Sequence, residues 1–488
     1  MPRPITIFLN TDQSRKTVFL LPDNEPDVRS RIIKEAQNKF RVKGINTIYL
    51  PGGVPFEDNA FPPALSSCFV GKGEPFVGRV AGPSTAAARQ PAEIRLFAQE
   101  SYIDEKAIAQ MKAVAALEGV LGVCGMPDLH PGDRFPIGCT MIAEGIYPAL
   151  IGSDIGCGIA LYELSSKRLR LASQPKRLAE KLRGLDDPWD GSVAEWLGRY
   201  GLEHHDRWKE FDQSLGTVGL GNHFVEICSV EAIADEAVAT ELGIGANSIY
   251  LLVHSGSRGL GAAILADARK TENNPYIRTD SPDLEAYLAD HDYAVKWAAA
   301  NRDLLAHRVL TCLKPASSEA ADEHEVGSSI EGESLRKILD ITHNSVTRAE
   351  VERQDLPPKV TWIHRKGVAP ARGVVPCAGS RGACSWLFKA EGDGRVNGFS
   401  LPHGAGRRYP RQAMHDRSKA SKSSLHTTEL GSEVVCTDPD LLIEEQPEAY
   451  KDMDCIVEDV EGFEIGKGVV KLRPIVTYKV REGGERRK

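Results

Sequence analysis

Five apolar runs in this chain meet a glycine-rich turn, and each junction carries a histidine, or an acid and a thiol, that a plain core does not need. They lie at 147–158 (YPALIGSDIGCG), 216–227 (GTVGLGNHFVEI), 247–261 (NSIYLLVHSGSRGLG), 359–367 (KVTWIHRKG) and 398–407 (GFSLPHGAGR). Strand ends beside flexible turns are where rigid scaffolds usually present reactive groups. Glycines there let backbone N–H groups close on an anion such as phosphate. Together the junctions favour a metal- and phosphate-binding site at the ends of strands.

Each junction alone also has a plainer interpretation. A single histidine on an apolar strand is more often a hydrogen-bonded core residue than a metal ligand. A cysteine beside glycines is usually a small buried hydrophobe. The inference therefore depends on the coincidence of all five junctions.

Composition limits the classes of protein that this chain can belong to. Its 488 residues carry a formal net charge of -8, which argues against non-specific coating of nucleic acid but leaves room for a local basic groove. The ten cysteines include no C-x-x-C pair, so neither a disulfide framework nor a zinc knuckle is indicated. The N-terminus turns polar early, and no apolar run approaches the roughly 18 residues of a membrane span. We expect a cytoplasmic protein that does not contact a membrane.

The order of patterns along the chain predicts an α+β fold. Apolar residues at helical spacing predict helices at 105–119 and 174–185, and a longer one after Ser281-Pro282 that continues through Val309. The acidic stretch 317–334 is typical of a surface excursion. No linker divides the chain, so we expect one large intergrown domain with mixed β-sheets and surrounding helices. Within it, 1–90 would be a divergent N-terminal segment packed on a catalytic core formed by 91–488.

The junctions belong to a longer series of motifs that resembles a known family. The series runs MPDLHPGDRFPIG (126–138), GSDIGCG (152–158), GTVGLGNHFVEI, HSGSRGLG (254–261), THN (342–344), HRKG (364–367), SLPHGAGR (400–407), AYKDMD (449–454) and KLRPIVTYK (471–479). In this order they resemble the motifs of the RtcB-type RNA ligases, also called 3'-phosphate/5'-hydroxyl RNA ligases or tRNA-splicing ligases. The resemblance covers about Gly125 to Lys479, and the first ninety residues do not share it.

The resemblance implies a specific reaction and metal site. The family joins an RNA end with a 2',3'-cyclic phosphate or 3'-phosphate to a 5'-hydroxyl end, using GTP, Mn²⁺ and a histidine–GMP intermediate. His403 matches the nucleophile. Two Mn²⁺ ions sharing the thiolate of Cys157 would be held by two ligand sets, namely Asp154, Cys157 and His223, and Cys157, His254 and His343. The softness of these ligands suggests zinc at least as readily, so manganese follows from the resemblance alone.

The resemblance also assigns a GTP pocket. It points to Asn222, Glu226, Asn344, Gly379, Ser380, Ser385, Gly404, Ala405, Gly406, Tyr450 and Lys479. Glu226 would accept from the guanine N1–H and amino group, which would reject adenine. Tyr450 is a candidate for stacking on the base, although a core tyrosine is equally consistent with its sequence context. Planar guanidinium groups suited to phosphate or RNA-backbone contacts are supplied by Arg258, Arg365, Arg407 and Arg411. Asp128 and His130 are expected near the metals, with no role assigned.

Departures from the family pattern cluster where GTP or RNA should bind. The usual PGSMG reads AGSRG here, with Ala378 and Arg381, and RRYPR (407–411) stands where Met-Ser-Arg normally follows the nucleophile motif. Asp133-Arg134 is also atypical. We therefore expect a divergent branch that acts in repair of a particular broken RNA or in tRNA splicing, most simply as a monomer, with a helper protein that speeds guanylylation as a candidate partner. Two alternatives stay open: a dinuclear metal-dependent phosphodiesterase, and a non-catalytic RNA-binding accessory protein.

Overall fold

The computed structural model divides the chain into two compact units, Met1–Gln90 and Pro91–Lys488, each described by itself. It describes residues 3–22, 25–51, 53–57, 67–77, 90–164, 172–185, 187–202, 206–270, 275–313, 335–353, 356–417 and 425–480. The predicted surface excursion at 317–334 lies outside these residues.

The N-terminal unit is a four-stranded sheet with one helix. The strand order is β2-β1-β4-β3, with β1 antiparallel to β2 and parallel to β4. The strands are β1 (Arg3–Leu9), β2 (Asp12–Leu21), β3 (Thr47–Tyr49) and β4 (Ser67–Gly71). Helix α1 (Val28–Phe40) begins where the Asp27 carboxylate accepts the N–H of Ser30, and its Ile32 and Ala36 pack on alternate residues of the strands.

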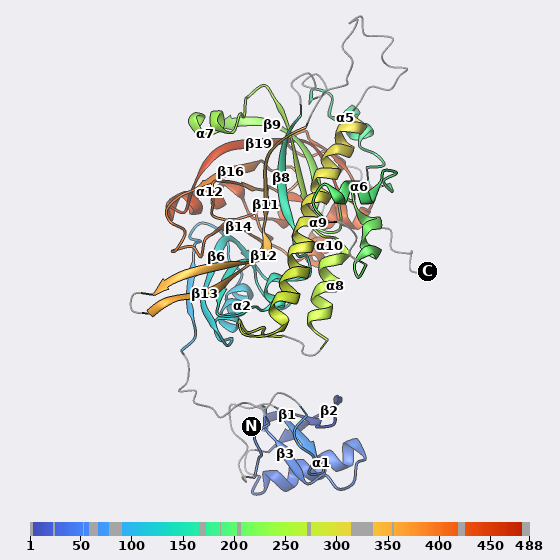
Figure 1. The fold of residues 1–488 in the computed structure, drawn as a ribbon, viewed down its shortest axis with the longest axis vertical. Helices are drawn as coiled ribbons and strands as arrows, with labels where there is room; N and C mark the ends of the chain where they lie inside the picture. The colour runs from blue at the N-terminus through green and yellow to red at the C-terminus, as the bar shows by residue number, and fades with distance from the viewer. Residues whose placement is uncertain are drawn as a thin grey trace, which may run out of the picture. The chain divides into compact units, whose positions relative to one another are not determined.

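The larger unit is built on an eight-stranded sheet (Figure 1). Its order is β11-β8-β10-β9-β19-β16-β15, and β18 pairs with β19. These strands are β8 (Gly158–Leu164), β9 (Phe224–Ile233), β10 (Ile249–Ser255), β11 (Arg336–Thr342), β15 (Val374–Cys377), β16 (Ser385–Ala390), β18 (Glu433–Val435) and β19 (Gly466–Tyr478). Strands β8 and β10 are buried almost throughout, as their near-continuous apolar sequences predict.

Two smaller sheets complete the larger unit. The first has the order β12-β13-β7-β6-β5, and the second pairs β14 with β17. These strands are β5 (Glu93–Leu96), β6 (Val120–His130), β7 (Ile137–Ala143), β12 (Asn344–Arg353), β13 (Leu356–Lys366), β14 (Val368–Pro370) and β17 (Ser400–Pro402). The mixture of sheets and surrounding helices confirms the predicted α+β class.

The antiparallel register brings the ends of distant strands to one place. Opposite Gly158, at the start of β8, lie Ser255 at the end of β10 and Thr342 at the end of β11. Phe224, which opens β9, lies opposite His254. Residues just outside these ends, such as His223 and His343, therefore meet around the same point.

The three predicted helices are present, and their ends differ from the predicted bounds by only a few residues. They are α2 (Glu105–Ala115), α5 (Pro175–Lys181) and the 30-residue α9 (Asp283–Cys312). Helix α9 packs on β8 and β10 (Figure 1), where its Leu305 and Val309 contact the core. The other α-helices are α6 (Val193–Gly198), α7 (Glu236–Glu241), α8 (Gly259–Ala268), α10 (Arg411–Arg417), α11 (Pro439–Glu444) and α12 (Met453–Gly462), with 3-10 turns at Lys209–Ser214 and Pro447–Ala449.

One predicted strand is wrong. The apolar run before Asp154 forms the single-turn helix α3 (Pro148–Ile151) rather than a strand. Pro148 occupies the first helical position, where its missing N–H costs nothing and its fixed φ favours the turn. Strand β8 begins only after the glycine-rich turn, at Gly158.

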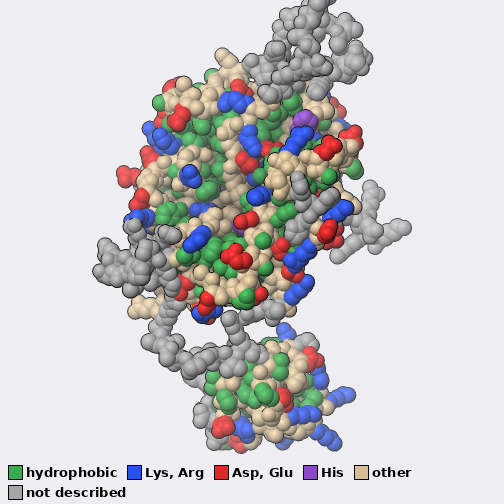
Figure 2. Space-filling model, viewed as in Figure 1, with side chains coloured by type: hydrophobic (Ala, Val, Ile, Leu, Met, Phe, Trp, Pro, Cys, Tyr) green, Lys and Arg blue, Asp and Glu red, His purple; other side chains and the backbone are tan. Residues whose placement is uncertain are grey.

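Charged side chains of both signs are interspersed over the face shown in Figure 2. Within the described part of the chain, no helix combines the length and the apolar character needed to cross a membrane.

Candidate functional site

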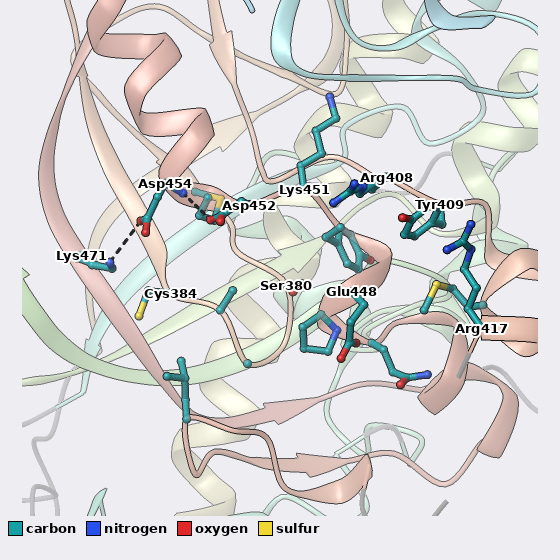
Figure 3. A pocket seen from close by; sticks show the side chains of 18 residues that line it. Ser380, Cys384, Arg408, Tyr409, Arg417, Glu448, Lys451, Asp452, Asp454 and Lys471 are labelled. Carbon is teal, nitrogen blue, oxygen red and sulfur yellow. Dashed lines mark hydrogen bonds and ion pairs between the residues drawn. The ribbon is translucent and has the colours of Figure 1, made fainter. Parts of the chain in front are cut away.

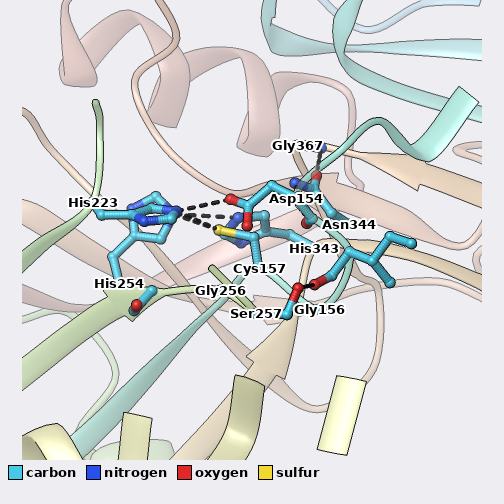
Figure 4. A network of polar contacts seen from close by, with 12 residues as sticks. Asp154, Gly156, Cys157, His223, His254, Gly256, Ser257, His343, Asn344 and Gly367 are labelled. Carbon is cyan, nitrogen blue, oxygen red and sulfur yellow. Dashed lines mark hydrogen bonds and ion pairs between the residues drawn. The ribbon is translucent and has the colours of Figure 1, made fainter. Parts of the chain in front are cut away.

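Five donor atoms from four segments of the chain converge beside the start of β8 (Figure 4). The Cys157 Sγ atom lies 3.1 Å from His223 Nε2 and 3.3 Å from His254 Nε2. His254 Nε2 lies 3.3 Å from His343 Nε2, and His223 Nε2 lies 2.8 Å from Asp154 Oδ2. The structure thus brings together all five predicted metal ligands. The sulfur of Cys157 is in contact with both His223 and His254.

The electrostatics of this cluster suit a cation. Burial, with His223 and His403 nearby, holds the pKa of His254 well below its usual range, and burial does the same for His343. Both imidazoles are therefore neutral, as metal ligands must be. Burial and the neighbouring Asp154 raise the pKa of the Cys157 thiol well above its ordinary value, a penalty that a bound cation would offset. The donor set fits divalent metal.

Glycine is required where the backbone closes against this cluster. A Cβ atom at Gly256 would lie 2.2 Å from the Asp154 Oδ1 atom. Any side chain at this position would displace the carboxylate, because real Cβ atoms do not approach that closely. The glycine after His254 and Ser255 thus keeps room for Asp154.

His403 lies next to the cluster and is fixed by Asp128. The centroid of its ring lies 4.5 Å from that of His343. Its Nδ1 atom lies 2.8 Å from Asp128 Oδ2, and the same oxygen accepts the backbone N–H of His403 at 3.2 Å. Asp128 is fully buried in β6. Gly406 turns the chain beside it with φ +67°, where a Cβ would lie 2.2 Å from the Asp128 carbonyl oxygen.

A cleft of about 540 Å³ opens in front of His403 and the donor cluster. Most of the predicted site residues line it, namely Asp154, Cys157, His254, His343, His403, Asn222, Asn344, Gly379, Ser380, Gly404, Ala405, Gly406, Tyr450 and Lys479. His223, Glu226 and Ser385 lie behind this lining. His223 reaches the cluster through Cys157 and Asp154, as described above. Ser385 accepts the backbone N–H of Gly379 at 3.0 Å and so supports the loop from behind.

Glu226 is buried at the inner end of the cleft. Its Oε2 atom accepts a hydrogen bond from Thr477 Oγ1 at 2.7 Å, and Thr477 itself lines the cleft. Burial raises the pKa of Glu226 to about 7, against the opposing effects of Thr477 and Lys479. The carboxyl group is therefore poised to ionise when a donor binds it.

A second buried carboxylate, Glu445, organises the cations of the cleft. It accepts hydrogen bonds from Lys479 Nζ at 3.1 Å, Arg407 Nη1 at 3.0 Å and Arg411 Nε at 3.3 Å, and from the hydroxyl of Tyr450. Burial alone would raise its pKa, but the three cations outweigh burial and lower the pKa to about 2. Glu445 is thus ionised and holds the positive groups in place.

Arg381, one of the departures from the family pattern, is also buried in the cleft wall. It is 5% exposed, and its Nη2 atom donates to the Leu442 carbonyl at 2.7 Å. Its Nε and Nη1 atoms have no hydrogen-bond partner among the described residues. Two buried donors without a partner among the described residues thus lie in the wall of the cleft.

Other predicted residues have roles in holding the backbone. Asn344 donates to the Asp154 carbonyl at 3.1 Å and accepts the N–H of Gly367 at 2.7 Å. The expectation that Arg365 contacts phosphate or RNA is wrong: it is buried, does not line the cleft, and donates to Ser400, Thr347 and the Phe399 carbonyl. Arg407 and Arg411 line the cleft, whereas Arg258 does not and donates to Thr217.

Sequence reasoning missed three site residues. Glu445 was not identified, Lys451 was not singled out within AYKDMD, and Lys366 was not singled out within HRKG. Lys451 Nζ donates to the carbonyls of Pro127 at 2.8 Å and Leu129 at 2.6 Å, which fixes the backbone on both sides of Asp128. Lys366 lines the cleft, and burial lowers its pKa to about 8. A charged residue within a motif was the available signal for both lysines.

Comparison with known proteins agrees with this geometry. A family model described as tRNA-splicing ligase RtcB matches residues 110–187 and 199–480. RNA-splicing ligase RtcB2 of Escherichia coli is 35% identical over 397 residues, covering 80% of this chain and 96% of that protein. The tRNA-splicing ligases RtcB of Pyrobaculum aerophilum and Aeropyrum pernix are 28% and 27% identical over 465 residues, covering 78% of this chain and 94% and 93% of those proteins. The resemblance found in the motifs is confirmed, and the chain belongs to the RtcB family.

Proposed function

We propose that this protein is an RNA ligase that joins a 2',3'-cyclic phosphate or 3'-phosphate RNA end to a 5'-hydroxyl end, using GTP and a guanylylated His403. The observation that carries the proposal is the position of His403. A carboxylate holds its ring through Nδ1, and the rings of two members of the donor cluster, His343 and His254, lie 4.5 and 6.2 Å from it between centroids. A plain core histidine needs neither neighbour.

Asp128 prepares His403 to act as a nucleophile. Because the carboxylate accepts the Nδ1–H, the neutral ring carries its lone pair on Nε2. That nitrogen can attack the α-phosphorus of GTP, forming a P–N bond as the bond to the β-phosphate oxygen breaks and pyrophosphate leaves. The resulting phosphoramidate stores the activated GMP. Asp128 stabilises the positive charge that the ring gains during the attack.

The donor cluster would hold two divalent cations, with Cys157 shared between them. Asp154 and His223 would complete one site, and His254 and His343 the other. Such cations, Mn²⁺ by resemblance to the family, supply charge neutralisation for the departing pyrophosphate and the reacting phosphates. The carbonyl and amide contacts of Asn344 keep the loop that carries Asp154 in place.

The inner end of the cleft would bind guanine. Ionised Glu226 accepts the N1–H and amino group of guanine, a pattern that adenine lacks. Lys479 and Arg407, positioned by Glu445, offer positive charge to the nucleotide, and the ring of Tyr450 forms one wall. The free donors of Arg381 suit acceptor atoms on the same nucleotide.

The RNA steps then follow from the activated GMP. A 2',3'-cyclic phosphate would first be opened by water, which breaks the P–O2' bond and leaves a 2'-hydroxyl and a 3'-phosphate. A 3'-phosphate oxygen of the RNA then attacks the phosphorus on His403, which breaks the P–N bond and leaves RNA capped by GMP. The 5'-hydroxyl of the second RNA attacks the RNA phosphorus, forms the new phosphodiester and releases GMP. Such a reaction would serve RNA repair or tRNA splicing.

Incubation with α-labelled GTP and Mn²⁺ tests the nucleophile. Wild-type protein is expected to retain label in a bond that is stable to base and labile to acid, as for a phosphoramidate. His403→Ala is expected to abolish labelling. His415→Ala is the matched control, because His415 is an exposed histidine that lies outside the cleft lining. Labelling that persists in His403→Ala would contradict the proposal, and a wild type that hydrolyses phosphodiesters without labelling would favour the phosphodiesterase alternative.

A further inference from the structure

A second cavity of about 830 Å³ adjoins the catalytic cleft (Figure 3). The two cavities share Ser380 and Tyr450 in their linings. The volume lies within the roughly 300–1,000 Å³ typical of ligand sites. None of the catalytic steps above uses this cavity, although it shares part of its wall with the cleft in which RNA ends would react.

Guanidinium groups and rings alternate along one side of this cavity: Arg408, Tyr409 and Arg417 line it, and Tyr102 lies outside the lining, against Arg408. Arg408 lies over the ring of Tyr102 at 5.8 Å and over that of Tyr409 at 5.5 Å, and Arg417 lies over Tyr409 at 3.9 Å. We call Tyr102, Arg408, Tyr409 and Arg417 the stacking strip. Three of its members come from the segment RRYPRQAMHDR (407–417), which begins where the family pattern is broken.

The strip is accessible and its charge is available. Both arginines are exposed, and Tyr102 is 50% exposed. Among the described residues, neither arginine forms an ion pair with a carboxylate. The backbone beneath is fixed, because the N–H groups of Arg408 and Tyr409 both donate to the Ala449 carbonyl, at 2.8 and 3.1 Å. The strip is thus a preformed surface.

The acids of the opposite wall are partly engaged within the protein. The Asp452 carboxylate accepts the N–H of Asp454 at the start of α12, and Asp454 pairs with Lys471 at 3.6 Å (Figure 3). Glu448 is the remaining exposed acid of the lining. The cavity therefore has a basic, aromatic side and a side whose charges are partly balanced.

We propose that the stacking strip and its cavity bind unpaired nucleotides of the RNA strand that enters the catalytic cleft. Rings and guanidinium planes offer surfaces on which successive bases stack, and the guanidinium groups also contact phosphates. Duplex RNA keeps its bases paired and stacked, so the strip selects broken ends that are single-stranded near the break. The inference rests on the proposed function for the identity of the strand as a substrate.

Binding of a fluorescent 12-nucleotide RNA with a 3'-phosphate tests the strip in the full-length chain. Arg408→Ala combined with Arg417→Ala is expected to raise the dissociation constant about tenfold or more. The slope of log K against log salt concentration should also become less steep, by up to about 1.4 if each arginine neutralises one phosphate. Tyr102→Ala should weaken binding with little change in salt dependence. The same sequence as a blunt duplex should bind wild type and variants equally.

Two controls separate the strip from the chemistry. Arg183→Ala removes an exposed arginine on α5's C-terminal side that lines neither cavity, and should leave binding unchanged. Labelling with α-labelled GTP should be equal in wild type and strip variants. If labelling is normal but the double variant binds RNA like wild type, the strip proposal is wrong and the ligase proposal stands. If wild type takes no label yet the variants lose RNA affinity, the ligase proposal fails and the strip proposal stands. If the strip variants lose GTP labelling but keep the RNA affinity of wild type, the strip proposal is wrong and the cavity is assigned to the nucleotide instead.

Discussion

Replacing Glu445 with Gln is expected to destabilise the larger unit, because three cations converge on one buried carboxylate. The contacts lower the pKa of Glu445 from an ordinary 4.5 to about 2. At about 1.4 kcal/mol per pH unit, this difference corresponds to about 3 kcal/mol of stability at neutral pH. An unfolding entropy of about 2 cal/mol/K per residue over Pro91–Lys488 converts it into a fall of about 4 °C in Tm.

The pH dependence of this effect has a definite sign. A carboxylate whose pKa is lower in the folded state stabilises the fold above its unfolded pKa. That contribution is lost as the pH falls from about 4.5 toward 2, because both states become protonated. The difference in Tm between wild type and Glu445→Gln should therefore be full at pH 7 and narrow progressively in acid.

Differential scanning calorimetry of the purified chain at several pH values provides the measurement. Glu444→Gln is the matched control, since this neighbouring acid contacts His415 at 3.5 Å and should contribute less than about 1 kcal/mol. A Glu445→Gln protein with the Tm of wild type at pH 7 would refute the reasoning. So would a difference between the two that is independent of pH.

Three further predictions concern the chemistry of the cleft. Arg381→Met should leave the free energy of unfolding of the nucleotide-free protein unchanged or raise it by about 1 kcal/mol, because removing two buried donors without partners offsets the loss of the bond to the Leu442 carbonyl. The GTP-induced rise in Tm should shrink, and an unaltered rise would contradict the proposed contact. The apparent affinity for GTP, measured from labelling, should fall about tenfold per pH unit below pH 7 as Glu226 becomes protonated; Glu226→Gln should remove this dependence, and a pH profile that it leaves intact would exclude Glu226 as the group responsible. Asp128→Asn should slow labelling about a hundredfold or more by losing the acceptor that orients His403; retention of the wild-type rate at equal stability would show that the ring is oriented by other contacts.

The sequence predicted the elements of the site better than the contacts that support it. Strand β10, whose last two residues are His254 and Ser255, and the turn that presents His403 after β17 both follow from apolar runs that stop at glycine. Each signal is contained in about a dozen consecutive residues. The four apolar residues of α3 fit the period of a strand as well as that of a helix, and Pro148 at the first helical position favours the helix.

The supporting contacts depend on residues far apart in the chain. Lys451 donates a hydrogen bond to the carbonyl of Leu129, which is 322 positions away in the sequence. Glu445 accepts one from Lys479, which is 34 positions away. A single sequence carries no pairing information at such distances, so Glu445 had no visible reason to be buried. Arg365 shows the converse error, since its position beside a motif indicated function while its partners are backbone and hydroxyl groups of the core.

The place of β19 has a consequence for how the protein matures. It is the last described strand of the chain, yet it lies between β9 and β16 in the middle of the eight-stranded sheet. Until it is synthesised, β9 and β16 each expose an unpaired edge, and Thr477, together with the adjacent Lys479, is missing from the wall of the cleft. The residues of the donor cluster are therefore all synthesised before the wall of the cleft can be completed. Chains that end before β19 would expose the unpaired edges of β9 and β16. We expect such chains to aggregate or to be bound by chaperones and proteases.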